Sequence, residues 1–354
     1  MRAPFSTTLS MIALAVSLAA CTDRGAGGGE AANDGAAGNG ANAVADGDGN
    51  AVYATYGVHS QAHSDLCQSP DCSYANQPGR PADPSYPPYW QSPWTMYKVT
   101  AGYETNPPPY NGKPPAGTQY EASSGASYYD STWRGKTGEG AMMEYYEKRC
   151  LPIFPFTPNN FTCAFISLGD TAYFLTFPQD RPKGMPPVCL FSPLNHPPRP
   201  DFIKHLPWAK GDSERLGKGA QGYSFWIDGN QDSPTFQKVV QVGASPDGTA
   251  KGWILFGYAF APVNGKMQPQ SFYFSGFPGT PPDAPIVSQN YTNWQPTRPD
   301  PAKTWNLVAG LDPAKLPACT VMDGPTDPKD GSLKATGKRP PTWFDLGKGP
   351  RKRT

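Results

Sequence analysis

FTCAFISLGDTAYFLTF, residues 161–177, decides the fold class of this chain. Two runs rich in aromatic and β-branched residues, at 161–168 and 171–177, flank the pair Gly169 and Asp170. A two-residue connection that begins with glycine is a favoured hairpin turn, because glycine tolerates the backbone conformation that such turns need. The stretch therefore predicts two antiparallel strands joined by a tight turn.

Further strands are expected in the C-terminal half of the chain, at residues 221–227, 235–242, 251–261 and 271–275. In the third of these segments, Leu255 and Ala259 alternate with Tyr258 and Phe260, so both faces are apolar. A strand with two apolar faces is typical of the middle of a sheet that is covered on both sides. We therefore expect the segment 251–261 to be a central strand.

One helix is expected over residues 139–149. Met142 and Tyr146 lie on one stripe at helical spacing, and Glu144 and Lys148 form an i,i+4 pair of opposite charge. We interpret the apolar stripe as core packing, because an apolar helix face is normally buried.

The composition combines 43 prolines and 38 glycines with 17 Phe, 18 Tyr and 9 Trp. Glycine and proline at this level indicate many loops, whereas disordered chains are poor in aromatic residues, so we expect a folded body. The net charge of +1 gives no basic surface and excludes a nucleic-acid partner of the usual kind. The predicted fold is mainly β, an antiparallel β-sandwich or barrel-like domain with long Pro/Gly-rich loops and one short helix.

The chain divides into five predicted segments. They are a signal peptide (1–20), a cysteine with a disordered Gly/Ala/Asn/Asp tether (21–50), a Pro/Tyr-rich extended region that wraps the core (51–135), a β-rich domain (136–347) and a basic tail (348–354). The tether is too poor in apolar residues to offset the entropy of ordering it. In the wrapping region the prolines favour edges and loops, because proline cannot donate to a ladder.

The N-terminal segment has the pattern of an export signal. Arg2 precedes a mostly apolar run from residue 9 to residue 20, which is shorter than the roughly 20 apolar residues that span a bilayer. The run ends in Leu-Ala-Ala-Cys at residues 18–21, which resembles the lipobox of bacterial lipoproteins. The resemblance implies that Cys21 becomes the lipidated first residue, a palmitate-type anchor in the membrane. It also implies that Thr22, in place of aspartate, favours the outer membrane.

The cysteine count supports this interpretation. Seven cysteines leave one thiol unpaired in an oxidising compartment. If Cys21 is lipidated, an even set remains that can close as three disulfides: Cys67, Cys72, Cys150, Cys163, Cys189 and Cys319. Their pairing is left open.

Two metal-like patterns are weighed against simpler structural roles. His59 and His63 precede Cys67 and Cys72, but outside the cytoplasm these thiols favour a disulfide over a metal site. The segment 228–232 has the Asp-x-Asn-x-Asp half of a calcium loop but lacks its glycine and its bidentate acid. We therefore expect neither a metal nor another cofactor.

No nucleophile elbow, zinc-protease, P-loop or dinucleotide motif occurs in the sequence. A glycosidase needs only two carboxylates that the fold brings together, and five acids are considered for this role: Glu121, Glu144, Glu147, Asp170 and Asp228. A candidate surface for stacking sugar rings is formed by Asn290, Tyr291, Asn293 and Trp294, with a packed loop as the simpler alternative.

These observations lead to a leading hypothesis and an alternative. The first is a lipid-anchored protein of the outer membrane or cell surface that binds an envelope glycan or protein, or associates structurally. Such a protein is displayed, or released to assist other secreted factors. The alternative is an extracytoplasmic hydrolase, with glycan as the expected substrate.

Overall fold

The structure is a computed structural model. It describes residues 74–103, 105–150, 160–169, 171–191, 202–228, 239–242, 253–276 and 286–320, with short pieces at 44–45, 51–52, 197, 200, 322–323, 332–335 and 337.

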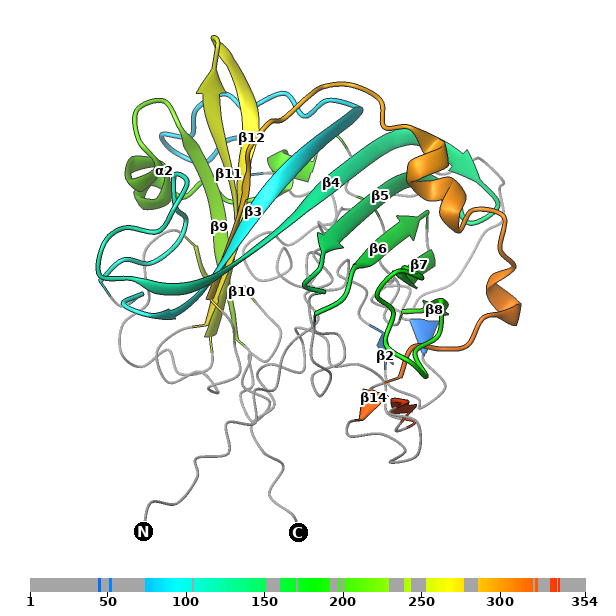
Figure 1. Cartoon of the computed structure of the whole chain (residues 1–354). Helices are drawn as coiled ribbons and strands as arrows, with labels where there is room; N and C mark the ends of the chain where they lie inside the picture. Colours follow the sequence, from blue (N-terminus) through cyan, green and yellow to red (C-terminus); the bar gives the residue numbers. More distant parts are fainter. Residues whose placement is uncertain are drawn as a thin grey trace, which may run out of the picture.

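One large antiparallel sheet of eleven strands forms the body of the protein (Figure 1), in the order β10-β9-β11-β12-β13-β3-β4-β5-β6-β7-β8. The strands are β3 (Tyr89–Ala101), β4 (Gln119–Gly135), β5 (Gly138–Glu147), β6 (Cys163–Leu168), β7 (Thr171–Thr176), β8 (Val188–Leu190), β9 (Gln221–Asp228), β10 (Val239–Val242), β11 (Trp253–Val263), β12 (Lys266–Gly276) and β13 (Ile286–Tyr291). The prediction of a mainly β, antiparallel fold is confirmed.

Two small ladders stand apart from the large sheet. The first pairs β1 (Val44–Ala45) with β2 (Ala51–Val52), and the second pairs β14 (Met322–Asp323) with β15 (Lys334–Ala335). The first ladder lies at the end of the predicted tether, which therefore contains at least one short strand.

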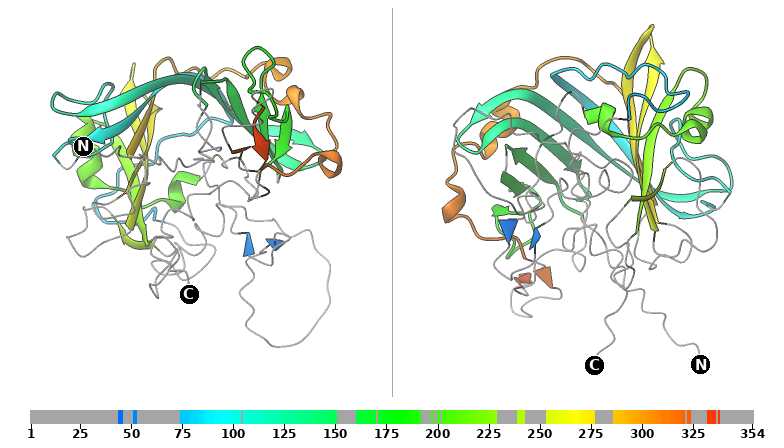
Figure 2. Two further views of the ribbon diagram at one scale, coloured as in Figure 1. Left: turned by 60° about the horizontal axis from the view of Figure 1, so that its bottom comes forward. Right: turned by 180° about the vertical axis from the view of Figure 1, so that it is seen from behind.

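The sheet bends strongly and does not close into a barrel. Strands β9 to β12 and strands β6 to β8 stand on opposite sides, with β3, β4 and β5 arching between them (Figures 1 and 2). The register shifts between β3 and β4, between β4 and β5 and between β11 and β12. Such bulges bend a strand and increase its local twist, which explains much of the curvature.

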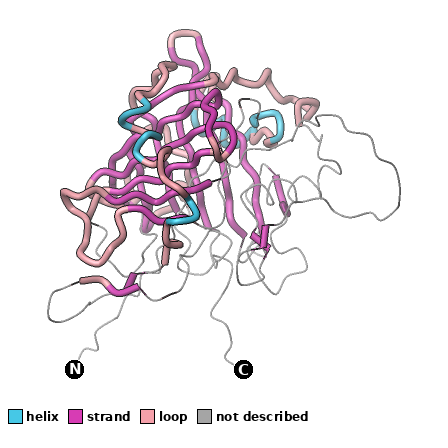
Figure 3. Tube along the Cα trace, turned by 90° about the vertical axis from the view of Figure 1, so that its right-hand side faces the viewer, coloured by secondary structure: helices cyan, strands magenta, loops and turns pink. Residues whose placement is uncertain are grey.

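Helix α2 (Lys210–Leu216) and the 3-10 helix η3 (Trp305–Leu307) pack on the outer face of the sheet; Figure 3 draws the helices in cyan. Helix α2 contributes Leu216 to a core with four side chains of β9, β11 and β12: Trp226, Leu255, Ala259 and Tyr273. On the other arm, Trp305 of η3 and Val308 pack against β5, β6 and β7. The 3-10 helices η2 (Pro301–Lys303) and η4 (Pro313–Lys315) flank η3 in the chain.

The inner face carries Trp90, Ser92 and Trp94 of β3 and the side chains in register with them. It holds an apolar core that includes Trp94, Tyr146, Phe165 and Phe174. A second group of rings surrounds Tyr86, whose ring centroid lies 4.9 Å from that of Phe202 in the 3-10 helix η1 (Phe202–His205). Both faces of β11 are thus buried, on the Leu255 side and on the Tyr258 side, as predicted for a central strand.

The hairpin of residues 161–177 is confirmed as β6 and β7, with Gly169 at a φ of 54° in the turn. Strands β9, β11 and β12 also form where they were expected. Strand β10 covers only the second half of the predicted segment 235–242, over Val239–Val242.

The helix predicted over residues 139–149 is wrong, because β5 occupies this segment. Met142, Glu144 and Tyr146 lie on the inner face, while Ala141 and Met143 face outward. Apolar residues on both faces remove the alternation that identifies a strand, and the stripe they leave resembles a helical one. Within the described residues the one α-helix is instead α2.

The predicted wrapping role of residues 51–135 is also corrected. Strands β3 and β4 from this region lie in the middle of the sheet and are its two longest strands. Pro93 is tolerated inside β3 because its carbonyl accepts from Thr292, immediately after β13 ends at Tyr291. The N and C=O of one strand residue point toward the same neighbouring strand. The N–H that Pro93 lacks would therefore point past the end of β13 and not toward β4, so the β3–β4 ladder loses no hydrogen bond.

Candidate functional site

The candidate site centres on Glu144, which lies in the middle of β5 with its side chain on the inner face. Across the ladder Glu144 is paired with Ser127 of β4, and Ser127 is paired with Ser92 of β3. Both serines are buried and Glu144 is only 2% exposed. Because the serine side chains are small, they leave room for a carboxyl group on a face that otherwise carries large aromatic rings.

Side chains from three strands donate hydrogen bonds to this carboxyl. Ser127 Oγ lies 2.8 Å from Glu144 Oε1 and 2.7 Å from Oε2. Trp94 Nε1 and Gln289 Nε2 each donate to Oε2 at 3.2 Å. The ring of Tyr146 lies edge-on to Trp94, with centroids 5.2 Å apart. We call these five residues, Trp94, Ser127, Glu144, Tyr146 and Gln289, the Glu144 cluster.

Burial raises the pKa of Glu144 to about 8, and the hydrogen bonds from Ser127, Gln289 and Trp94 lower it only in part. The carboxyl therefore binds a proton at neutral pH. Burial also raises the pKa of Tyr146 and Tyr291 well above its ordinary value, and the charge of nearby Glu144 adds to this effect. Both phenols keep their protons at every ordinary pH.

Two oxygen atoms of the cluster have unused capacity to accept hydrogen bonds. Gln289 Oε1 and the Tyr146 hydroxyl are buried and have no hydrogen-bond partner within the part of the chain that the structure describes. In the same residues no Lys, Arg or His forms an ion pair with Glu144. The cluster thus presents a carboxyl and two further acceptors without a matching cation.

The aromatic and amide residues predicted for sugar stacking do not share one surface. Asn290 and Tyr291 are neighbours on β13 and point to opposite faces, and Asn290 Nδ2 donates to the carbonyl of Gly112 at 2.5 Å. Asn293 is exposed and Trp294 is partly buried. Only Tyr291 of the four is brought to the Glu144 cluster, since it interacts with Glu144 and Ser127.

The five candidate carboxylates have different positions. Glu144 is buried, whereas Glu121 and Glu147 are exposed; Glu121 pairs with Arg149 at 2.5 Å. The side chains of Asp170 and Asp228 lie outside the described residues. Among the side chains that are described, no second acid joins Glu144, so they do not supply the carboxylate pair of a glycosidase.

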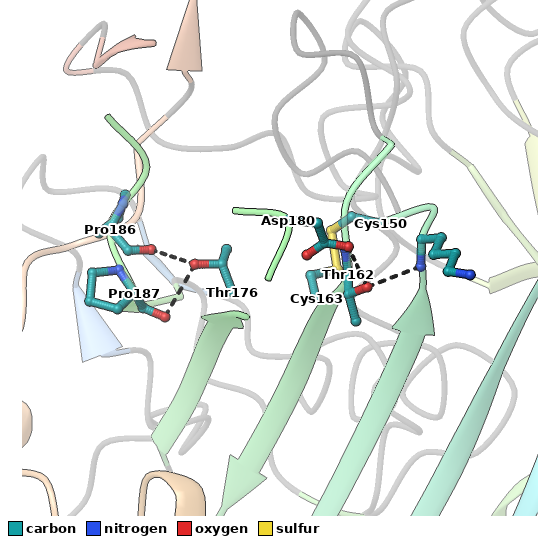
Figure 4. The surroundings of a disulfide bond; sticks show 8 residues. Cys150, Thr162, Cys163, Thr176, Asp180, Pro186 and Pro187 are labelled. Atoms are coloured by element: carbon teal, nitrogen blue, oxygen red, sulfur yellow. Dashed lines mark hydrogen bonds between the residues drawn. A yellow bond between two sulfur atoms is a disulfide. The ribbon is translucent and has the colours of Figure 1, made fainter. Parts of the chain in front are cut away.

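Two disulfides form among the six candidate cysteines. Cys150 is bonded to Cys163, and Cys189 to Cys319. Beside the first bond, the N–H and hydroxyl of Thr162 both donate to Asp180 Oδ2, at 2.8 and 2.7 Å (Figure 4). The second bond ties the edge strand β8 to the segment after η4, where Cys319 N also donates to the carbonyl of Leu190.

Several predicted features lie outside the described residues. These are the signal peptide and lipobox with Cys21, most of the tether, His59, His63, Cys67, Cys72, the calcium-like loop after residue 228 and the basic tail. Where side chains are described, no three His, Cys, Asp or Glu gather as a metal site. The helices in the described ranges are all too short or too polar to span a lipid bilayer.

Comparisons with known proteins assign no family. No protein-family profile matches the chain, and no curated protein sequence is significantly similar to it. Among solved structures, the chain is similar to an uncharacterized conserved protein from Thermus thermophilus, at 8% identity and a TM-score of 0.26. The match covers 64% of this chain and 90% of the other. A likeness this weak carries no argument about function.

Sequence reasoning named Glu144 only as one acid among five, and it missed Trp94, Ser127 and Gln289 as its partners. The available signal was a single acid inside the apolar run Ala-Met-Met-Glu-Tyr-Tyr at residues 141–146. An acid in such a run needs a polar partner if the segment is a buried strand. The predicted helix hid this requirement, because a helix allows the acid to face solvent.

Proposed function

We propose that the chain is a lipid-anchored binding protein of the bacterial envelope, held at the outer membrane or cell surface through Cys21. Its folded body acts by binding through the inner face of the large sheet. From there it is displayed on the cell or released to assist other secreted factors.

The cysteines support the proposed location outside the cytoplasm. Four of the seven form two disulfides, and persistent disulfides are typical of compartments outside the cytoplasm. Cys67 and Cys72 remain as a third possible pair, which leaves Cys21 alone at the position where the lipobox resemblance places the lipid. In this proposal Cys21, the one cysteine left without a disulfide partner, carries the lipid.

The Glu144 cluster carries the binding role. A buried carboxyl with no cationic partner among the described residues is costly for a fold, and apolar side chains in its place usually stabilise a core as well or better. Buried groups with a strongly shifted pKa gather at functional sites more often than elsewhere. Tyr291 lies beside the cluster, and part of this residue is exposed to solvent although its phenol group is buried.

Replacing Cys21 tests the proposed lipid anchor and the location of the protein. Cells that express the wild type or Cys21→Ser are labelled with radioactive palmitate, fractionated and treated with protease while intact. We expect label and outer-membrane fractionation only for the wild type, and digestion of the wild type on intact cells. Equal labelling of both proteins, or a wild type in the soluble cytoplasmic fraction, would contradict the proposal. Digestion only after lysis would exclude surface display.

A further inference from the structure

The hydrogen-bond inventory of the Glu144 cluster is unbalanced. The indole N–H of Trp94, the hydroxyl of Ser127 and the amide N–H of Gln289 all donate to one carboxyl group. The acceptors that remain, Gln289 Oε1 and the Tyr146 hydroxyl oxygen, have no donor within the described residues. Each belongs to a side chain with no exposed surface. The Tyr146 hydroxyl accepts as well as donates, so a ligand with several donors would give both oxygens a partner.

The surroundings favour a positive charge for this group. Glu144 is the one acid of the cluster, and none of the cations whose positions are described pairs with it. The buried rings of Trp94 and Tyr146 lie beside the carboxyl, with Tyr291 next to them. Surroundings of low dielectric strengthen the attraction between a carboxylate and a cation.

An organic ammonium group fits this arrangement better than a metal ion. A primary ammonium carries three N–H donors, and the cluster has three acceptors: the Glu144 carboxylate, Gln289 Oε1 and the Tyr146 hydroxyl. Calcium needs six to eight oxygen ligands, and zinc needs several His, Cys or acid ligands. No such group of three occurs where the structure describes side chains.

We propose that the Glu144 cluster binds the ammonium group of a small organic amine. This inference rests on the proposed binding function and names the chemical class of the ligand. The bound cation takes the place of the proton that Glu144 otherwise carries, so binding at neutral pH releases that proton to solvent. The substituent of the amine extends toward Tyr291, the partly exposed residue at the edge of the cluster.

The test titrates n-butylammonium chloride into the full mature chain in non-ionic detergent, by calorimetry at pH 7 in phosphate and in MOPS, two buffers without a primary ammonium group. We expect saturable binding whose enthalpy differs between the buffers by the release of close to one proton per amine. Affinity falls about tenfold at pH 6, because the proton competes for Glu144. The uncharged analogue n-butanol gives no saturable heat.

Variants separate the cluster from nonspecific uptake. Glu144→Gln abolishes binding, while Glu147→Gln, an exposed acid of the same strand, leaves it unchanged. Tyr146→Phe removes an acceptor with no partner in the described residues, so it keeps the fold and weakens binding five- to tenfold. The proposal fails if n-butylammonium gives no saturable heat, if binding persists in Glu144→Gln, or if Tyr146→Phe binds like the wild type.

Failure of this inference leaves the proposed function standing. Palmitate labelling of Cys21 and fractionation of the cell do not depend on amine binding. A chain that is labelled and exported but takes up no amine therefore removes only the ligand class. Loss of labelling with retained amine binding removes the lipid anchor and leaves the site.

Discussion

Gly125 of β4 and Trp94 of β3 are directly paired, and the indole ring of Trp94 covers the space that a side chain at Gly125 would occupy. A Cβ at Gly125 would lie 2.3 Å from the Trp94 ring and 2.0 Å from the carbonyl oxygen of Tyr145. The glycine therefore lets Trp94 lie flat along the inner face, where its N–H reaches Glu144. Gly125 thus helps to position the N–H group of Trp94 that donates to Glu144.

Gly125→Ala is expected to lower the free energy of unfolding by about 3 kcal/mol, because one of the two clashes is with a backbone atom that cannot rotate away. Urea unfolding followed by tryptophan fluorescence measures this. The matched control is Gly211→Ala on α2, where no atom lies within 4 Å of the new Cβ. Equal stability of the Gly125 variant and the wild type would show that the strands adjust to the added methyl group.

The shifted pKa of Glu144 predicts a pH dependence of stability. Its folded value of about 8 exceeds the ordinary value of 4.5, so between these two pH values the folded protein holds a proton that the unfolded chain has lost. The contribution of Glu144 to the free energy of unfolding is therefore greatest below about pH 4.5 and falls as the pH rises to 8. The loss amounts to about 5 kcal/mol, and above pH 8 it changes no further.

Glu144→Gln mimics the protonated carboxyl and isolates this contribution. The difference in unfolding free energy between variant and wild type is expected to grow in favour of the variant from pH 5 to pH 8, as measured by urea titrations at each pH. Glu147→Gln on the exposed side of the same strand serves as the control. Parallel pH profiles for Glu144→Gln and the wild type would rule out the shift.

Arg80 ties the N-terminal segment to the 3-10 helix η1. Its side chain is only 1% exposed, donates to the carbonyls of Ile203 and Leu206, and lies over the Tyr223 ring at 4.9 Å. Lysine cannot make both bonds with one ammonium group in this geometry. Arg80→Lys is therefore expected to cost about 2–3 kcal/mol of unfolding free energy in urea titrations.

The control for Arg80→Lys is Arg134→Lys. Arg134 forms an ion pair with Glu139, and both side chains are exposed, at 60% and 65% respectively. Exposed ion pairs contribute little, so this change is expected to cost less than about 0.5 kcal/mol. Similar losses for the two variants would mean that the buried carbonyl contacts of Arg80 add nothing beyond its charge.

The sequence allowed correct prediction where a turn residue and alternation agree. The β6–β7 hairpin is the clearest case, since Gly169 supplies the turn and the flanking runs are strongly β-forming. The prediction failed at β5, because buried residues on both faces leave no alternation to detect. It failed again at β3, where Pro93 marks the end of a neighbouring ladder and not the edge of the sheet.

The candidate site was less predictable than the fold. The hydrogen bonds that join Trp94, Ser127 and Gln289 to Glu144 or to each other span 17 to 162 residues of the chain. Their meeting depends on the strand order β13-β3-β4-β5, in which β13 pairs with its sequence neighbour β12 on one side and with the sequence-distant strand β3 on the other. Local patterns contain no information about the pairing of β13 with β3, so the acid was identifiable but its partners were not.

The two disulfides are expected to differ in their effect on stability. Cys189 and Cys319 are 130 residues apart, whereas Cys150 and Cys163 are 13 apart. In the chain-entropy model the longer loop restricts the unfolded chain more, so the double Cys→Ala variants are expected to lose about 5 and about 3 kcal/mol respectively. The Cys189–Cys319 bond also ties β8 to the segment after η4, where Cys319 N donates to the carbonyl of Leu190. Guanidinium unfolding of both variants under oxidising conditions measures the difference. A smaller loss for the long loop than for the short one would show that contacts in the native state, and not the constraint on the unfolded chain, set the effect.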